Sequence, residues 1–296
     1  IATLFQPLTS RAFIKIQDGC DNYCSYCIIP YVRGLSRSRD PQAIKREIRT
    51  LVANGYREIV ITGIHTGGYG RDLKDFSFSR LIREILEENP NLYRLRISSI
   101  EASEIDDDFI ALLRRYPNIA DHLHIPLQSG SETVLKRMNR RYAIKDYEAT
   151  ISKAREARPG IAITTDVIVG FPGETDAEFQ ETVELIRRVA FSELHVFPFS
   201  KRENTLAAKM PEQVTDITKK KRVGELLKLS SDLHAQYEQG NHGRPLSVLF
   251  EDYDEAEKTY RGHSSNYLEV HVQSAANLCG QVRTIDYRGP RNSLVK

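Results

Sequence analysis

Short apolar runs alternate with segments of helical periodicity along the first two hundred residues. Six such runs occur, at 12–17 (AFIKIQ), 58–63 (EIVITG), 94–100 (RLRISSI), 122–128 (HLHIPLQ), 162–170 (AITTDVIVG) and 193–200 (ELHVFPFS). Parallel strands need long crossover connections, which are usually helices, and strands buried on both faces are apolar almost throughout. The alternation therefore predicts an α/β fold whose parallel sheet has right-handed crossovers.

Six strand–helix units are too few for a closed eight-stranded barrel. We expect an open, partial (β/α)6 TIM-like barrel, with chemistry at the carboxyl ends of the strands. A doubly wound sheet is the alternative topology, because strand spacing along the chain does not distinguish the two.

Capping signals mark where several helices begin. Asp40 precedes Pro41, and Asp at the cap followed by Pro at the first helical position is a favoured start. Thr175 and Glu178 have the spacing of a capping box. Other helices are expected across 78–88 and 106–115, and in a longer stretch that ends near Arg158.

The pattern changes after Pro211. A long helix is predicted with one apolar face, which comprises Val223, Leu226, Leu227, Leu233 and Tyr237. The segment 239–245 (QGNHGRP) is predicted to break it, and the three runs LSVLFEDY, YLEVHVQS and CGQVRTIDY beyond it have strand character. We therefore expect a core domain over 1–240 and a small all-β, OB-like domain over 241–296.

Composition excludes some classes of protein. The 296 residues are 40% hydrophobic and 28% charged, with a net charge of +2, so overall charge does not indicate a nucleic-acid binder. No apolar run approaches the roughly 20 residues that span a bilayer. Three of the four cysteines lie within eight positions, which makes a poor disulfide framework. We expect a reducing, cytoplasmic setting and no membrane partner.

The three clustered cysteines, Cys20, Cys24 and Cys27, have the spacing C-x3-C-x2-C. Thiolates suit zinc, copper(I) and iron–sulfur clusters. Structural zinc usually has four protein ligands, and a [4Fe–4S] cluster usually has four cysteines. Three from one loop would leave one iron open to a small molecule. A zinc site completed by a distant residue, or three incidental cysteines, remain the alternatives. Cys279 is expected to be a small packed residue.

This triplet, with Tyr26 just before its last cysteine, resembles the radical S-adenosylmethionine enzymes. The resemblance extends through RAFIKIQDGCDNYCSYCIIPYVRGLSRSRD, IVITGIHTGGYG, HIPLQSGSETVLKRMNRRY and TTDVIVGFPGETDAEFQET. Together these segments resemble the methylthiotransferase branch, and the terminal β module resembles a TRAM domain. TGIHTGGYG is similar to the subgroup that acts on threonylcarbamoyladenosine in tRNA.

The resemblance implies that Cys20, Cys24 and Cys27 each ligate one iron of a [4Fe–4S] cluster. S-adenosyl-L-methionine would chelate the fourth iron, and a 5′-deoxyadenosyl radical would abstract hydrogen before sulfur insertion and methyl transfer. The residues expected around this cofactor are Tyr26, Gly63, His65, Gly67, Gly68, Glu101, Gln128, Asp166, Ile168 and Phe197. His65 and Tyr69 are interpreted as hydrogen-bonded neighbours rather than as catalysts. No catalytic side chain is assigned.

The family resemblance also implies an N-terminal domain with three more cysteines and a second [4Fe–4S] cluster. The chain begins without Met, directly before the radical core, so we interpret it as N-terminally truncated. The expected partners are a tRNA anticodon stem-loop and a flavodoxin-like electron donor, and a monomer is favoured.

Two basic sets could contact RNA phosphates. They are Arg33, Arg37, Arg39, Lys45, Arg46, Arg49 and Arg57, and Lys258, Arg261, Arg283, Arg288, Arg291 and Lys296. Alternatively, each set lies on solvated helices and turns and binds no RNA. Arg39 could instead have a structural role. Three other functions stay open: methylthiolation of isopentenyladenosine in tRNA, methylthiolation of a ribosomal-protein aspartate, and a zinc-stabilised RNA-binding protein without redox chemistry.

Overall fold

The computed structural model describes residues 10–291 and 293–295, and it contains the predicted open barrel. The barrel strands are β1 (Arg11–Asp18), β3 (Glu58–Gly63), β4 (Arg94–Ile97), β5 (His122–His124), β6 (Ala162–Val169) and β7 (Glu193–Pro198). They form two parallel groups, β1-β3-β4 and β5-β6-β7. Consecutive barrel strands are neighbours within each group, whereas a doubly wound sheet requires a reversal of strand order. The alternative topology is therefore wrong.

The two groups meet at β4 and β5. Ile100 N donates to His124 O at 3.0 Å, and Leu95 pairs with Ile119 in a parallel bridge. The barrel sheet has a further strand that was not predicted, the two-residue β2 (Arg37–Ser38), which pairs antiparallel with β1 at the edge of the sheet.

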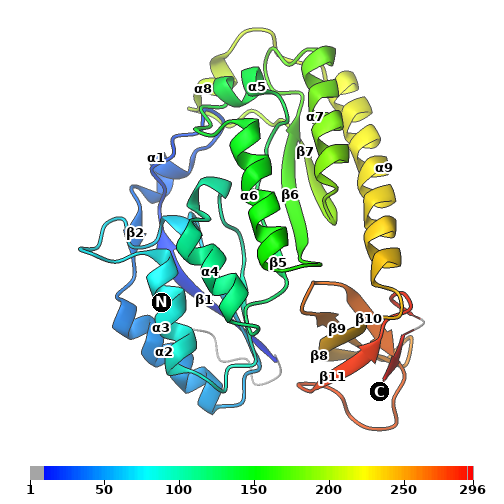
Figure 1. Ribbon diagram of the computed structural model, residues 1–296. Coiled ribbons are helices and arrows are strands. Elements are labelled where there is room, and N and C mark those ends of the chain that lie inside the picture. Colours follow the sequence, from blue (N-terminus) through cyan, green and yellow to red (C-terminus); the bar gives the residue numbers. More distant parts are fainter. Residues whose placement is uncertain (1–9, 292, 296) are drawn as a thin grey trace.

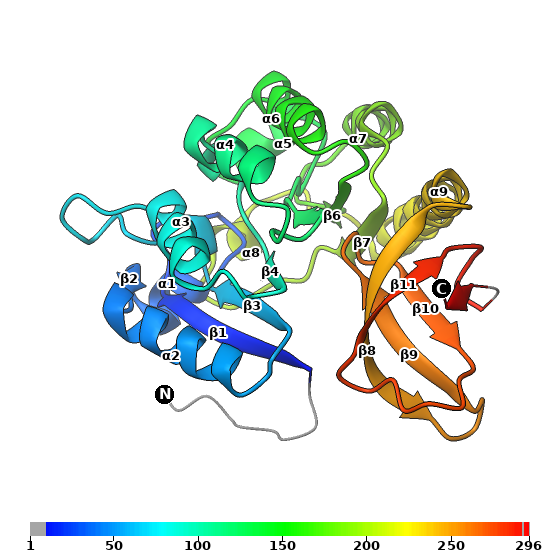
Figure 2. The ribbon, with the colours of Figure 1, turned by 60° about the horizontal axis from the view of Figure 1, so that its bottom comes forward.

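Six longer helices cover the convex side of the curved sheet (Figure 2). They are α2 (Pro41–Ala53), α3 (Phe78–Glu88), α4 (Asp107–Arg115), α6 (Ile144–Ala157), α7 (Asp176–Val189) and α9 (Asp216–Asn241). Short elements follow the carboxyl ends of the strands: α1 (Ile29–Arg33), η1 (Thr66–Gly68), η2 (Ala102–Glu104), α5 (Glu132–Arg137) and α8 (Leu206–Lys209). None of the described helices has the length and apolar character that a membrane crossing requires.

The predicted helix caps are confirmed. The Asp40 carboxylate accepts hydrogen bonds from the Gln42 and Ala43 amides, with Pro41 at the first position of α2. Thr175 and Glu178 form the reciprocal capping box at the start of α7. These contacts satisfy amides that a helix start would otherwise leave without partners.

The apolar face of α9 was predicted with one error. Leu226 and Leu233 are buried where α9 packs along β7, but Leu227 is 50% exposed. Leu227 points about 100° away from Leu226 around the helix axis and lies outside the face that packs on the sheet. The helix also continues to Asn241, into the segment that was predicted to break it.

The C-terminal module is a five-stranded antiparallel sheet in the order β10-β9-β8-β11-β12. Its strands are β8 (Pro245–Asp254), β9 (Thr259–Ser264), β10 (Glu269–Val272), β11 (Val282–Asp286) and β12 (Leu294–Val295). Sequence reasoning missed β9, which is largely polar and contains Gly262. A Cβ at Gly262 would lie 2.4 Å from Leu249 O, so this strand needs glycine to approach β8. The expectation that Cys279 is packed is wrong, because its side chain is exposed in the segment before β11.

A buried ion cluster lies at the amino-terminal ends of β3 and β4. The side chain of Glu58 is fully buried, and its carboxylate lies 2.7 Å from Arg96 Nε and 2.9 Å from Arg94 Nη1. Arg11 Nε lies 3.4 Å from the same carboxylate. One anion thus holds three strands of the barrel through three guanidinium groups.

The same arginines contact the β module. Arg94 Nη2 donates to Ser247 O at 2.9 Å, and Arg96 Nη2 donates to Ser264 O at 3.2 Å. The Arg96 guanidinium lies 4.6 Å from the ring centroid of Tyr267, which also stacks on His122. The module is therefore docked below the barrel, at the end opposite α5 and α8 (Figure 1).

We predict that Glu58→Gln lowers the free energy of unfolding by about 3–5 kcal/mol at neutral pH, because it leaves buried guanidinium groups without their counter-charge. Burial alone would raise the pKa of Glu58, but Arg96 and Arg94 outweigh it and hold that pKa at about 2. The folded-state pKa is below the ordinary carboxyl value, so the stabilisation is complete above about pH 4.5 and is lost as the pH falls toward 2.

Urea denaturation of the wild type and Glu58→Gln across this pH range measures both effects. The matched control is Glu148→Gln, which breaks the exposed pair with Arg188 and should change the free energy of unfolding by less than about 0.5 kcal/mol. A difference between wild type and Glu58→Gln that stays constant from pH 5 to pH 2 would contradict the assignment.

Candidate functional site

The cysteine loop follows β1 and is folded tightly against residues 34–36. Gly19 has φ of 74°, and a Cβ there would lie 2.0 Å from Leu35 O, so this position requires glycine. Cys20 N donates to Gly34 O at 3.1 Å, and Cys27 N donates to Cys24 O at 3.0 Å. The three cysteines of the loop are free thiols and partly exposed. The loop thus presents three thiols at the carboxyl end of the barrel.

The segment after α5 braces this loop. Ser25 N donates to Met138 O at 3.0 Å, and Asn139 Nδ2 donates to Tyr23 O at 2.9 Å. The ring of Tyr26 packs edge-on against Phe171, with 6.4 Å between the ring centroids. Burial raises the pKa of Tyr26 well above its ordinary value, so its phenol stays neutral. Tyr26 thus anchors the loop from behind.

A buried arginine lies beside the thiols. Arg140 Nη1 is 3.6 Å from Cys24 Sγ, and the same guanidinium forms a bidentate pair with the Glu101 carboxylate. Arg140 therefore joins the cysteine loop to the Glu101 carboxylate. Sequence reasoning placed Glu101 at the site but missed Arg140, whose only signal was its position within the family-like segment that ends in NRRY.

His65 forms the opposite wall of the site. Its Nε2 lies 2.5 Å from Glu104 Oε1 and 3.3 Å from Asn22 Nδ2. Burial disfavours the imidazolium, but hydrogen bonds to Cys20 and Glu104 outweigh this and raise the pKa of His65 to about 10. His65 is therefore a hydrogen-bonded neighbour, as interpreted, and Glu104 is a site residue that the sequence analysis missed.

The glycines after β3 make room for this pair. A Cβ at Gly67 would lie 2.3 Å from Glu104 Oε2, and one at Gly68 would lie 2.7 Å from His65 Nδ1. Gly63 packs against Gln17, whose Oε1 accepts a hydrogen bond from His65 N at 2.8 Å. These glycines therefore position His65 and Glu104 and do more than form a turn.

An open pocket lies between the two walls, and it is lined by Cys24, His65, Glu101, Glu104, Arg140 and others. Three of the residues predicted from sequence thus meet at one cavity. Its lining combines a thiol, two carboxylates, three arginines and an imidazole, which is suited to a polar, zwitterionic ligand beside a metal centre.

The other predicted residues lie along the barrel interior. Val167 and Val169 belong to the core, so the alternate residues Asp166 and Ile168 face the opposite side of β6. Gln128 pairs with Val167 through an isolated bridge, and Phe197 on β7 is 50% exposed. The structure therefore separates the predicted set into a cavity group and an interior group.

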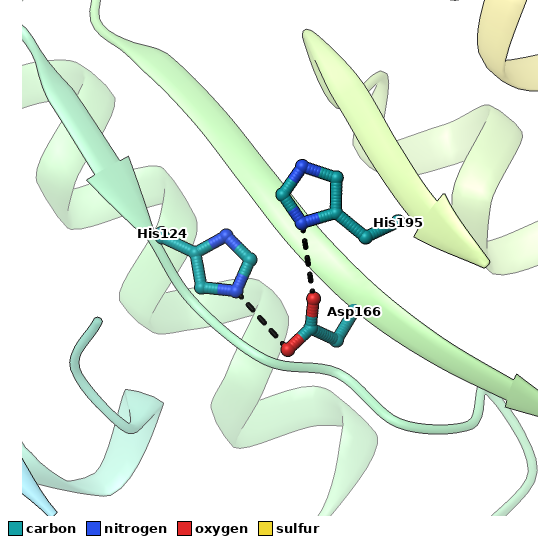
Figure 3. A group of neighbouring side chains, drawn as sticks. All are labelled: His124, Asp166 and His195. Atoms are coloured by element: carbon teal, nitrogen blue, oxygen red, sulfur yellow. Dashed lines mark hydrogen bonds and ion pairs between the residues drawn. The ribbon is translucent and has the colours of Figure 1, made fainter. Parts of the chain in front are cut away.

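The carboxylate of Asp166 already has partners in this interior. His124 Nε2 and His195 Nδ1 each lie 3.2 Å from one of its oxygens (Figure 3). Burial would raise the pKa of Asp166, but the two imidazoles hold it well below its ordinary value. Neither histidine was singled out in the sequence analysis, because the strands that bring them together are far apart along the chain.

Several other candidate residues have structural roles. Tyr69 is buried, and its hydroxyl donates to Arg39 O at 2.8 Å. Lys45 is buried against Glu84 and Glu88, and Arg39 pairs with Glu47. Part of the first basic set therefore serves the fold and is engaged with carboxylates. In the second set, Arg261, Arg288 and Arg291 pair with Asp252, Asp286 and Glu257, respectively.

We predict that Gly67→Ala lowers the free energy of unfolding by about 1–3 kcal/mol, because its methyl group overlaps the Glu104 side chain. The matched control is Gly224→Ala within α9, where the added methyl meets open space; it should stabilise the chain by roughly 0.5–1 kcal/mol. Urea denaturation measures both. Changes of the same sign in the two variants would show that Gly67 has no packing role.

The profile described as the radical SAM superfamily matches residues 14–186. The chain is 47% identical over 276 residues to threonylcarbamoyladenosine tRNA methylthiotransferase MtaB of Bacillus subtilis, covering 92% of this chain and 61% of that protein. It is 42% identical over 265 residues to the enzyme of the same name from Thermotoga maritima, covering 89% and 59% of the two chains.

A second group of relatives has a different name. The chain is 38% identical over 263 residues to tRNA-2-methylthio-N(6)-dimethylallyladenosine synthase of Caldicellulosiruptor saccharolyticus, covering 88% of this chain and 56% of that protein. The chain thus spans about three fifths of the length of these curated relatives.

Solved structures agree with the fold. Coproporphyrinogen III oxidase (HemN) from Escherichia coli, described as a radical SAM enzyme, superposes with a TM-score of 0.58 at 16% identity, covering 78% of this chain and 54% of that one. The radical S-adenosylmethionine methyltransferase TsrM from Kitasatospora setae gives a TM-score of 0.56 at 20% identity, covering 66% and 38%. At these identities the likeness concerns the fold alone.

Proposed function

This chain belongs to the radical SAM superfamily, and from that premise we propose that it is part of a tRNA methylthiotransferase. The proposed substrate is N6-threonylcarbamoyladenosine next to the anticodon, which would be converted to its 2-methylthio derivative. The two relatives with the highest identities reported above carry this activity in their names, and the dimethylallyladenosine synthase is less similar. Because the chain spans about three fifths of these relatives, the activity is proposed for the whole protein.

The observation that carries the proposal is the cysteine loop. Three free thiols project from one short loop at the carboxyl end of the barrel, and Cys279, the fourth, lies in the β module. Soft thiolates at this spacing fit a [4Fe–4S] cluster, and a set of three leaves one iron for a non-protein ligand. Arg140 lies beside Cys24 and His65 lies beside Cys20, so two of the three thiols have a cationic neighbour. When bound, the cluster and S-adenosyl-L-methionine would supply radical chemistry that protein side chains lack.

The residues of the chain would then bind and orient the cluster and S-adenosyl-L-methionine and shield them from water. Cys20, Cys24 and Cys27 would hold the cluster, and Tyr26 would keep the loop packed against Phe171. The amine and carboxylate of S-adenosyl-L-methionine fit a cavity whose walls carry both signs of charge, from Glu101, Glu104, Arg140 and His65. Gly63, Gly67 and Gly68 would allow the backbone to approach the ligand on this side.

The residues of the interior group would contact the substrate and the part of S-adenosyl-L-methionine that lies beyond its amine and carboxylate. Ile168 and Phe197 offer apolar surface, and a half-exposed aromatic ring can stack on a base. Gln128 has φ of 64°, an uncommon backbone conformation for a residue other than glycine, at the point where β5 turns toward the barrel mouth. Asp166 would face the bound cofactor and substrate from its position between the imidazoles of His124 and His195.

The proposal extends to partners and location. The C-terminal antiparallel sheet would act as a TRAM-type module that grips tRNA, through exposed basic residues such as Lys258 and Arg283. A flavodoxin-like electron donor, a monomeric state and a cytoplasmic location, where tRNA is modified, belong to the same proposal.

We predict that anaerobic reconstitution of the chain with iron and sulfide produces the broad visible absorption of a [4Fe–4S] cluster. Cys24→Ala should abolish it, because two thiolates cannot hold a cluster that leaves its fourth corner open. Cys279→Ala is the matched control and should retain full absorption, since its thiol is exposed in the β module. A colourless protein that takes up zinc instead would contradict the proposal and support a zinc-stabilised RNA-binding protein.

We predict that deleting the gene removes the 2-methylthio group from threonylcarbamoyladenosine in cellular tRNA and leaves methylthiolated dimethylallyladenosine unchanged. Mass spectrometry of nucleosides measures both marks in one sample. Re-expression of the full-length gene should restore the mark, and a full-length Cys24→Ala variant should not. Loss of the dimethylallyladenosine mark would assign the other tRNA substrate, and an unchanged tRNA would favour a ribosomal-protein aspartate.

A further inference from the structure

A second group of possible metal ligands lies in the barrel interior, away from the cysteine loop. His124 on β5, Asp166 on β6 and His195 on β7 project from the same face of three neighbouring strands, and helices lie behind that sheet (Figure 3). Strand register brings them together, because Asp166 pairs directly with His195, and Thr164 pairs with His124. The ligand atoms of the three side chains lie within 4.8 Å of one another.

The orientation of His124 is fixed from behind. Its Nδ1 lies 2.9 Å from Thr164 Oγ1, and that hydroxyl also lies 3.0 Å from Nε2 of the buried His122. Burial holds the pKa of His122 well below its ordinary value, so this imidazole is neutral. We assign Thr164 Oγ1 as acceptor of the proton on His124 Nδ1 and as donor to Nε2 of the neutral His122, which leaves Nε2 of His124 unprotonated and able to bind a metal. Such an outer hydrogen bond orients a metal-binding histidine, because it settles which nitrogen faces the metal.

The distances suit a first-row metal ion. Two metal–ligand bonds of about 2.1 Å that meet at about 100° place their donor atoms about 3.2 Å apart. Both histidine nitrogens lie 3.2 Å from an oxygen of Asp166. The two ligand atoms that lie farthest apart are at most 4.8 Å from each other, so one side chain must move inward slightly for all three to bind one ion. His195 can make this movement, because its side chain is 48% exposed on the strand at the edge of the sheet.

Charge favours a cation at this position. Asp166 supplies one carboxylate to the group, and Glu193, two residues before His195 on the same strand, brings a second carboxylate close enough to act on that histidine. Two imidazoles and one carboxylate are ligands that zinc and iron(II) accept, and three protein ligands leave positions open for water or a bound oxygen ligand.

We propose that His124, Asp166 and His195 form a binding site for a divalent first-row transition-metal ion of the zinc or iron(II) class. The site contains no cysteine and comes from β5, β6 and β7, so it is separate from the cysteine loop that follows β1. It therefore does not rest on the proposed function, and its open positions face the barrel interior, where Ile168 and Phe197 also lie.

The test uses the untagged full chain with Cys20, Cys24 and Cys27 all replaced by Ala, so that the cysteine loop binds no metal. After treatment with a chelator, the protein is titrated with Co²⁺ and followed by visible absorption, and Zn²⁺ is added as a competitor. One Co²⁺ per chain, displaced by one Zn²⁺, is expected. Asp166→Asn and His195→Ala should abolish this binding, and Thr164→Val should weaken it about 10–100-fold, because it removes the support of His124.

His271→Gln is the matched control, because His271 pairs with Glu269 and Glu257 in the β module, far from the barrel interior. It should bind Co²⁺ as the parent does. Thermal unfolding of each variant separates lost ligands from lost structure, and Asp166→Asn preserves the shape of the side chain. The proposal is overturned if the parent binds no Co²⁺, or if Asp166→Asn and His195→Ala bind it as tightly as the parent. In that case the three residues form only a hydrogen-bonded relay.

Discussion

The buried carboxylate of Glu58 is the constraint on which the rest of the structure depends. Its side chain is fully buried, and the guanidinium groups of Arg94 and Arg96 beside it are nearly so. A buried charge without a partner is strongly unfavourable, so these strands must stay in the register that keeps the charges together. The remaining donors of the two arginines are satisfied by carbonyls of the β module. The cluster thus determines the barrel register and the position of the module at the same time.

This arrangement gives the barrel three levels. The ion cluster and Tyr267 of the module lie at the amino-terminal ends of the strands, the pair of histidines around Asp166 lies in the interior, and the cysteine loop lies at the carboxyl ends. Polar contacts connect the first two levels, because Tyr267 stacks on His122 and His122 reaches His124 through Thr164. A ligand held by the module would therefore be placed relative to the interior by rigid contacts and not by a flexible linker.

Local patterns in the sequence predicted the elements well. Asp40, Thr175 and the six apolar runs act through neighbours a few residues away, so their effects can be read without a structure. The cysteine triplet is equally local. Leu227 shows the limit of this reasoning, since an apolar residue beside a buried one was assigned to the same face although helix geometry separates them. Strand β9 was missed because its polar residues and Gly262 are explained only by contact with β8.

Long-range partners account for what the sequence did not reveal about the site. Arg140, Glu104, His124 and His195 acquire their roles only when distant segments meet, and single-sequence patterns contain no information on those pairings. Arg94 and Arg96 were read as parts of a strand, and only the burial of Glu58 explains why charged residues occur there.

The site is assembled across the seam between the two halves of the barrel. The half containing β1, β3 and β4 supplies the cysteines, His65 and Glu101, and the segment after β5 supplies Arg140. The ion pair between Glu101 and Arg140 crosses this seam, close to the hydrogen bond from Ile100 N to His124 O. Because Arg140 also lies against Cys24, this thiol has its cationic neighbour only when both halves are docked. Folding of the barrel and assembly of the site are therefore one event, since the ion pair that closes the seam also holds the guanidinium group of Arg140 against a thiol of the cysteine loop.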